Sequence, residues 1–164
     1  MTHRSMVSKF LASSMASALA FAPLAIGAVT LVAPAVAEAA DAACRIHVVE
    51  AKEEGDGKIP AELDFMADEL KAPAFRIYKG FELIDVQDFK LELGKVSEKK
   101  FKSGHTLQLS LLGEQDGKLE LQTKLMRSST VLVDMDFGVR SNQIMLIPVM
   151  RGDSAVIFAY QCKH

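Results

Sequence analysis

The clearest alternation of apolar and polar positions lies in residues 107–125, LQLSLLGEQDGKLELQTKL. Leucines alternate with polar residues on both sides of a central turn that contains Asp116 and Gly117. An Asp-Gly pair between two alternating segments is a strong hairpin signal. One face of the hairpin is rich in leucine, whereas the other is polar and can remain in water. The pattern therefore predicts two antiparallel strands whose leucine face needs a second apolar layer.

Most of the remaining chain shows the same strand-like alternation, interrupted by glycine, serine and charged turns. The further predicted strands are residues 44–51, 75–86, 89–93, 131–137, 144–150 and 155–162, with residues 96–102 as a weak, highly charged edge strand or loop. In one segment the apolar residues recur at helical spacing and not at strand spacing. Residues 59–72 place Leu63, Met66 and Leu70 at helical spacing, with Pro60 suited to the first helical position, so a short amphipathic helix is predicted to end before Pro73.

About eight strands and one short α-helix predict a mainly β fold, either an antiparallel β-sandwich or a flattened barrel. Residues 144–150, IMLIPVM, are apolar at successive positions, so both faces of this strand must be covered. Pro148 has no backbone N–H to donate, which favours an edge position. An apolar edge strand can lie under the helix or meet a partner. The candidate partner surface consists of Ile144, Leu146, Pro148 and Met150.

The first residues differ in kind from the rest. Residues 1–37 contain Arg4 and Lys9 near the start, no acidic residue, and a long apolar stretch that ends in Ala35 and Ala37. A basic start, an apolar middle and an A-x-A end are typical of a cleaved secretory signal peptide. We therefore predict a signal peptide over residues 1–37, a short tail over 38–43 and one domain over 44–164, in a periplasmic or extracellular protein with no membrane span after cleavage.

Two alternatives to a cleaved signal fit parts of this segment. The apolar region is longer than a typical signal core, which would suit an uncleaved membrane anchor, but two prolines and many alanines favour cleavage. A lipoprotein signal ending at Cys44 would need an aliphatic residue at position 41, and Asp41 occupies it.

The two cysteines, Cys44 and Cys162, stand at opposite ends of the predicted domain. An even pair in an oxidising compartment predicts a structural disulfide. A redox-active or metal-binding pair is the alternative, and the sequence offers neither C-x-x-C spacing nor a neighbouring histidine other than His164.

Charge and motifs exclude several function classes. From residue 38 onward the chain carries 17 Lys and Arg against 21 Asp and Glu, without a basic stripe, which argues against nucleic acid and anionic membranes as partners. The glycines are scattered singly, and no serine lies in a G-x-S-x-G motif. No catalytic residue, metal ligand or cofactor is therefore predicted.

The individual histidines and aspartates do not predict a catalytic or metal site either. His47, His105 and His164 lack the paired spacing of zinc ligands, so they are predicted to face solvent. Asp134 and Asp136 share a strand face about 7 Å apart, which could serve acid/base chemistry or Ca²⁺, but a solvated face is preferred. Residues 151–153 match the Arg-Gly-Asp adhesion tripeptide and are predicted to be a turn.

The segments CRIHVVEAKE, IPAELDFMADELK and PAFRIYKGFELID resemble small exported bacterial β-rich proteins of unknown function. The resemblance spans most of the mature chain and implies no activity. Our leading hypothesis is a non-enzymatic exported protein that binds an envelope or secreted protein, as an accessory component of an envelope or secretion assembly. The alternatives are a carrier of a small apolar ligand and, less favoured, a hydrolase that uses Asp134 and Asp136.

Overall fold

The structure is a computed structural model that describes residues 41–163. The expected signal peptide, the first part of the tail at residues 38–40, and His164 lie outside the described residues. The elements, in chain order, are β1 (Ala42–Lys52), η1 (Ala61–Met66), α1 (Ala67–Leu70), η2 (Pro73–Phe75), β2 (Gly80–Leu91), β3 (Val96–Lys100), β4 (His105–Gln115), β5 (Lys118–Arg127), β6 (Thr130–Arg140), β7 (Ile144–Arg151) and β8 (Ser154–Lys163).

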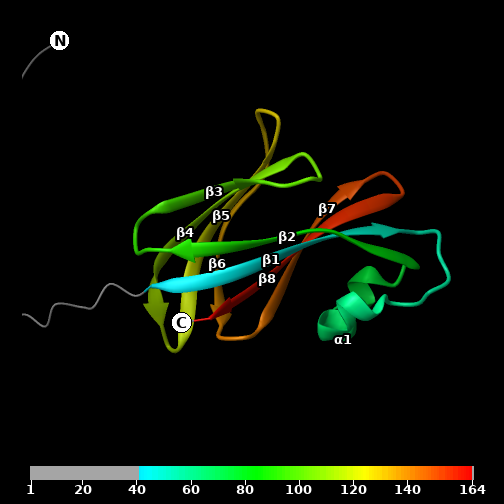
Figure 1. Cartoon of the computed structure of the whole chain (residues 1–164), viewed down its shortest axis with the longest axis horizontal. Helices are drawn as coiled ribbons and strands as arrows, with labels where there is room; N and C mark the ends of the chain where they lie inside the picture. The colour runs from blue at the N-terminus through cyan, green and yellow to red at the C-terminus, as the bar shows by residue number, and fades with distance from the viewer. Residues whose placement is uncertain (1–40, 164) are drawn as a thin grey trace, which may run out of the picture. The chain divides into compact units, whose positions relative to one another are not determined.

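The eight strands form two antiparallel four-stranded sheets (Figure 1). The first sheet has the order β2-β1-β8-β7, and the second has the order β3-β4-β5-β6. The predicted mainly β sandwich is confirmed, whereas the alternative of a flattened barrel is wrong, because the two sheets remain separate in the described part of the chain. A sandwich buries one face of each sheet against the other and leaves the outer faces for water or for an additional layer.

The leucine hairpin is formed as predicted. Strands β4 and β5 pair antiparallel, and Gln115 lies opposite Lys118 across a two-residue turn. Asp116 and Gly117 both have positive φ, 53° and 69°, which is the conformation that suits a tight hairpin and that Asp and Gly tolerate. The alternating leucines of this hairpin all lie in the apolar interior: Leu107, Leu109, Leu111, Leu119, Leu121 and Leu125.

The layer that covers these leucines is the first sheet. Ile46 and Val48 of β1 and Phe158 and Tyr160 of β8 are fully buried in the same cluster. Strand β6 does not belong to this covering layer, because it is the neighbour of β5 within the second sheet. The terminal strands β1 and β8 are neighbours, which explains how cysteines from the two ends of the domain meet.

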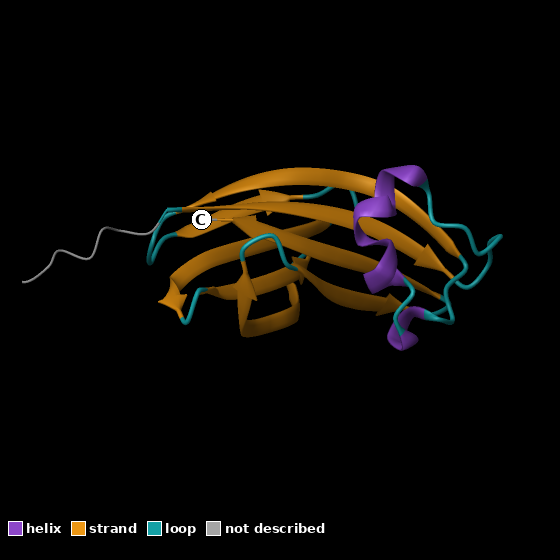
Figure 2. Cartoon of the chain, turned by 90° about the horizontal axis from the view of Figure 1, so that it is seen from below, coloured by secondary structure: helices purple, strands orange, loops and turns teal. Residues whose placement is uncertain are grey.

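The predicted helix is shorter and less regular than its sequence period suggested. Residues 61–66 form a 3₁₀ turn, a single α-helical turn follows, and a second 3₁₀ turn lies at residues 73–75. We call residues 61–75 the helical cover. Its buried residues Leu63, Met66 and Leu70 pack against the outer face of the first sheet, at Val49 and Ile157, and not over the hairpin. Figure 2 shows these turns lying across the strands at one end of the molecule's described part.

Strand boundaries differ from prediction around the helical cover. Residues 75–79 were expected to begin a strand, but Phe75 ends a 3₁₀ turn and β2 begins at Gly80. A Cβ atom at Gly80 would lie 2.5 Å from the carbonyl oxygen of Glu54, so a side chain cannot fit at this crossing. Strand β2 then continues to Leu91 and joins two segments that were predicted separately, while the weak segment becomes β3.

Candidate functional site

The candidate partner surface lies on β7, and the structure divides it. Strand β7 is an edge strand, as Pro148 indicated. Ile144 and Leu146 are partly buried against the cluster beneath the helical cover, whereas Pro148 is exposed and Met150 is 62% exposed. The Tyr78 hydroxyl donates to Sδ of Met150 at 3.2 Å. Only the half of this surface at Pro148 and Met150 is therefore open to a partner.

The opposite face of β7 explains why its sequence is apolar at successive positions. Met145, Ile147 and Val149 point toward the second sheet and join the cluster between the sheets. The strand is thus covered by a sheet on one face and, at its start, by the helical cover on the other.

Strand β6 is the free edge of the second sheet and is more exposed than β7. Of the seven residues from 130 to 136, six are exposed and Val133 is intermediate. Three large apolar side chains are among them: Val131 at 44%, Leu132 at 39% and Met135 at 42% exposure. The pairing with β5 shifts register between Leu125 and Met126, so this end of the edge also carries an irregularity. An exposed apolar edge offers unpaired backbone groups to another strand.

The other side of the sandwich is closed by hydrogen bonds between its two edge strands. The Lys102 backbone N–H donates to the Asp85 carboxylate at 2.9 Å, and the Gln87 side-chain amide donates to the Lys100 carbonyl at 2.9 Å. Asp85 and Gln87 belong to β2, and Lys100 ends β3. No side-chain hydrogen bond joins the described residues of the edges β6 and β7 outside the turn that connects them, so this side is the open one.

A cationic cluster lies where β7 ends and β4 begins. Nη2 of Arg151 donates to the Ser103 carbonyl at 3.3 Å and lies 3.1 Å from Nε2 of His105. Nδ1 of His105 lies 2.9 Å from the Ser103 hydroxyl. Because a guanidinium can only donate, Nε2 is the acceptor and Nδ1–H donates to Ser103. Arg127 is the cross-strand partner of His105 and lies on the same sheet face.

The expectation that His105 faces solvent is wrong. The ring is fully buried and packs edge-on against Phe158, with ring centroids 5.3 Å apart. Burial, together with the positive charges of Arg151 and Arg127, lowers the pKa of His105 to about 4. Neutral His105 is thus a fixed acceptor for Arg151.

The expectation for His47 is also wrong, because this side chain is buried on the outer face of the first sheet. Its ring lies 4.5 Å from the ring of Phe65 in the helical cover, and Nδ1 has no hydrogen-bond partner. Burial, followed by the nearby charge of Arg45, lowers the pKa of His47. The ring is held neutral as part of the packing under the cover.

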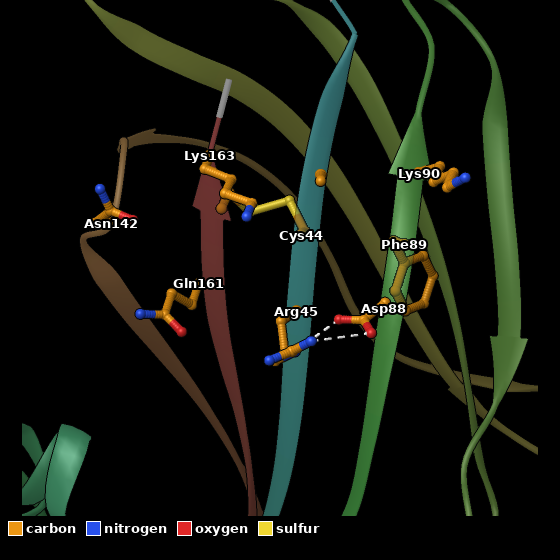
Figure 3. Close-up of a pocket in the computed structure, with 10 residues that line it drawn as sticks. Cys44, Arg45, Asp88, Phe89, Lys90, Asn142, Gln161 and Lys163 are labelled. Carbon is orange, nitrogen blue, oxygen red and sulfur yellow. Dashed lines mark hydrogen bonds and ion pairs between the residues drawn. A yellow bond between two sulfur atoms is a disulfide. The ribbon is translucent and has the colours of Figure 1, made fainter.

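A hollow of about 490 Å³ lies on the outer face of the first sheet, beside the disulfide (Figure 3). Arg45 donates to Asp88 across it at 2.7 Å, and the hydrogen bond with Arg45 holds the pKa of Asp88 below its usual value. Gln161 and Asn142 line the opposite side. Arg45 and Asp88 are paired with each other, so neither presents an uncompensated charge, whereas Lys90 and Lys163 also line the hollow and form no ion pair among the described residues.

The disulfide itself is confirmed. Cys44 and Cys162 face each other on β1 and β8 and form an S–S bond of 2.03 Å. The described residues contain no other cysteine.

The remaining candidate residues do not come together into a site. Asp134 forms an ion pair with Lys124 at 3.5 Å, and the described residues contain no group of three His, Cys, Asp or Glu side chains that could hold a metal ion. Gly152 and Asp153 of the Arg-Gly-Asp tripeptide form the predicted turn between β7 and β8, whereas Arg151 ends β7 and its side chain points toward His105.

Within the described residues, no helix is long and apolar enough to cross a membrane. Comparison of the chain with models of known families, with curated protein sequences and with solved structures finds no match. The fold and the site thus define a disulfide-bonded, two-sheet β-sandwich with one open edge.

Sequence reasoning missed two features of that open edge. The exposure of β6 on both faces depends on how far the first sheet extends over it, which alternation along β6 does not reveal. The Arg151–His105 contact joins residues 46 positions apart and has no local sequence signal.

Proposed function

We propose that this protein is an exported, non-enzymatic binding protein that accepts an extended segment of another protein along β6, at the open edge of the sandwich. The observation that carries the proposal is the edge segment 130–136, which is unpaired on one side and exposed on both faces. An incoming strand gains main-chain hydrogen bonds from such an edge and side-chain contacts on alternating faces. The disulfide and the lack of a membrane-crossing helix among the described residues are compatible with export.

The proposed partner surface thus lies between β6 and the end of β7, and not along the whole of β7 as the sequence predicted. Ile144 and Leu146 are occupied by contacts within the chain, so they contribute to the fold. A strand added to β6 would cover Met135 and extend the second sheet past the part that the first sheet covers. Pro148 makes β7 a poorer acceptor of a strand, because its nitrogen carries no hydrogen to donate.

Charge on β6 indicates the chemistry of the partner. Asp134 and Asp136 are both exposed, and Asp136 lies opposite Gln122 with no ion pair in the described part of the chain. Like charges opposite each other on neighbouring strands are destabilising, so antiparallel pairing of two β6 strands is disfavoured. A segment that alternates apolar and basic residues would instead place its basic side chains beside the two carboxylates. We therefore expect a different polypeptide, not a second copy, as the partner.

Amide hydrogen exchange with a matched pair of peptides tests this function. Both peptides have eight residues that alternate apolar and charged positions, with Lys in one and Glu in the other, and both have blocked ends. The Lys peptide should slow exchange at residues 130–136 and leave β2 unchanged. The Asp134→Lys, Asp136→Lys double variant should reverse the preference.

A photo-crosslinking residue at position 135, used in the native host, then identifies the natural partner. Position 126 is the control, since Met126 lies on the neighbouring, non-edge strand β5. If neither peptide protects residues 130–136, and position 135 captures no more than position 126, strand addition at β6 is wrong. No observation on the described residues favours the carrier or the hydrolase.

A further inference from the structure

The hollow beside the disulfide contains Ala43 between two lysines. Strand register places Ala43 of β1 opposite Lys90 of β2 on one side and opposite Lys163 of β8 on the other. Residues directly opposite each other on antiparallel strands share a sheet face, and neighbouring strands lie about 4.8 Å apart, so the Cα atoms of the two lysines are separated by about 10 Å. All three residues line the hollow. Because alanine has only a methyl group, the space above it stays open between the two longer side chains.

The next row of the same sheet face supplies further hydrogen-bond donors. Arg45 lies opposite Asp88 on one side and Gln161 on the other. Nε and Nη2 of Arg45 donate to the Asp88 carboxylate at 2.7 and 3.2 Å, whereas Nη1 makes no hydrogen bond within the described residues. The side-chain amides of Gln161 and Asn142 line the opposite side of the hollow and donate to no described residue. Three side chains therefore have donors available to a ligand.

The hollow is cationic, although the chain as a whole has a formal net charge of −2. Arg45, Lys90 and Lys163 line it together with the single carboxylate of Asp88, which leaves a net charge of +2. Both lysines are exposed, and neither forms an ion pair among the described residues. A second hollow, of about 440 Å³ near the β7–β8 turn, is lined by three carboxylates and two cations. The positive balance is therefore a property of the hollow beside the disulfide and not of both hollows.

A phosphate group matches this arrangement better than a monocarboxylate does. Phosphate is mostly a dianion at pH 8, so its charge offsets the net charge of the hollow, whereas a monocarboxylate offsets half of it. The phosphate oxygens can accept from ammonium, guanidinium and amide donors at the same time. The hollow of about 490 Å³ lies within the range of about 300–1,000 Å³ that is typical of small-molecule sites. A phosphate carried on a small organic group is therefore the ligand that charge and size favour.

We propose that the hollow binds the phosphate group of a small molecule above Ala43, between Lys90 and Lys163, with Asp88 as a positioning residue that orients Arg45. Figure 3 shows Lys163 extending from β8 toward β1, whereas Lys90 extends away from β1. Binding therefore involves a rotamer change at Lys90, which an exposed lysine makes readily. The phosphate has two possible sources, a soluble phosphate compound and the headgroup of an anionic lipid. This site goes beyond strand addition at β6, because β6 belongs to the other sheet.

An NMR titration of the disulfide-bonded protein with inorganic phosphate at pH 8 tests the site. At constant ionic strength, the backbone amide signals of Ala43 and Lys163 should shift along one saturable curve, with a half-maximal concentration in the millimolar range. Acetate should bind more weakly. The Lys90→Gln, Lys163→Gln double variant should weaken phosphate binding at least tenfold. Lys71→Gln is the matched control and should leave the curve unchanged, since Lys71 is exposed, forms no ion pair among the described residues and lies outside the hollow.

Asp88→Asn is a variant in which binding should improve. Loss of the carboxylate raises the net charge of the hollow to +3 and releases Arg45, so phosphate should bind at least twofold more tightly. Misfolding of the variant cannot produce such a gain. A linear response to phosphate, a saturable response that persists in the double lysine variant, or unchanged binding in Asp88→Asn overturns the site.

Lipid vesicles separate the two sources of the phosphate. Sedimentation with vesicles that contain phosphatidic acid, but not with pure phosphatidylcholine vesicles, identifies a lipid headgroup if the double lysine variant abolishes it. Saturable binding of glycerol 3-phosphate without sedimentation identifies a soluble compound. Failure of the site leaves strand addition at β6 standing, because protection of residues 130–136 by the Lys peptide does not involve the hollow.

Discussion

Thr123 and Tyr160 join the two sheets through a hydrogen bond between their hydroxyl oxygens, 2.8 Å long and fully buried. Thr123 lies on β5 of the second sheet, and Tyr160 lies on β8 of the first. The ring of Tyr160 also packs edge-on against Phe137 of β6, with centroids 5.3 Å apart. Burial raises the pKa of Tyr160 far above its usual value, although the bond with Thr123 opposes the shift. This polar contact lies between the two sheets among apolar side chains, and it requires both partners.

Removal of one partner should therefore cost more than removal of both. Tyr160→Phe leaves the Thr123 hydroxyl buried without its partner and should lower the free energy of unfolding by about 1–2 kcal/mol. Thr123→Val with Tyr160→Phe should recover most of that loss. Urea unfolding of the single and double variants measures the coupling, and Tyr78→Phe, whose hydroxyl donates only to a thioether, should cost less. Additive losses would show that the bond does not stabilise the sandwich.

The disulfide should supply a large share of the stability. It closes a loop with a sequence separation of 118, for which the chain-entropy model gives about 5 kcal/mol. Cys44→Ala with Cys162→Ala should lower the free energy of unfolding by about 3–5 kcal/mol, measured by denaturant titration. Alkylation of the unreduced, denatured wild-type protein should label no cysteine. Two labelled cysteines would contradict the bond.

His105 should make stability depend on pH. Its pKa is about 4 in the folded protein and near 6.5 in the unfolded chain, so the unfolded state binds more protons between these values. The contribution of His105 is fully present above pH 6.5 and is lost as pH falls toward 4, with a slope of up to about 1.4 kcal/mol per pH unit. His105→Gln keeps an acceptor for Arg151 but does not titrate. The wild-type minus variant difference in unfolding free energy should therefore decline over this window, and a flat difference would contradict the assignment.

In the helical cover, Leu63 should contribute more than Phe65 to the free energy of unfolding. Leu63 is fully buried against the first sheet, so Leu63→Ala should cost about 2–5 kcal/mol. Phe65 is 42% exposed, and Phe65→Ala should cost less.

The Phe65→Ala variant has a second readout at His47. Loss of the ring should admit water to Nδ1 and raise the pKa of His47 toward its usual value, which an NMR titration of the imidazole measures. Leu63→Val, which retains the cover, is the control and should leave that pKa unchanged. An unaltered pKa in Phe65→Ala would show that other groups bury the ring.

Features that depend on neighbouring residues in the chain were predictable. Alternation identified the hairpin and its buried leucines, Asp-Gly identified its turn, and Pro148 identified an edge strand. The cysteine pair needed only an even count and its position at the ends of the domain. Each of these signals acts over a few residues or through one covalent bond.

The helical cover shows where local signals became insufficient. Its apolar residues at helical spacing predicted a buried face correctly, but not which surface that face would cover. Either the hairpin or the outer face of another sheet can bury leucines equally well. The breakdown of the helix into 3₁₀ turns likewise follows from its fit onto Val49 and Ile157, which local propensity does not contain.

The sequence by itself determined that this chain forms a mainly antiparallel β fold, either a sandwich or a flattened barrel, with one disulfide, because periodicity specifies which side of each strand is buried. Only the tertiary structure decided which strands share a sheet, how far each sheet covers the other, and therefore that β6 is open. It also brought Arg151 from the end of β7 to His105 at the start of β4. Strand pairing and sheet overlap are contacts between distant residues, and a strand's own pattern of apolar and polar positions is the same whichever partner covers it.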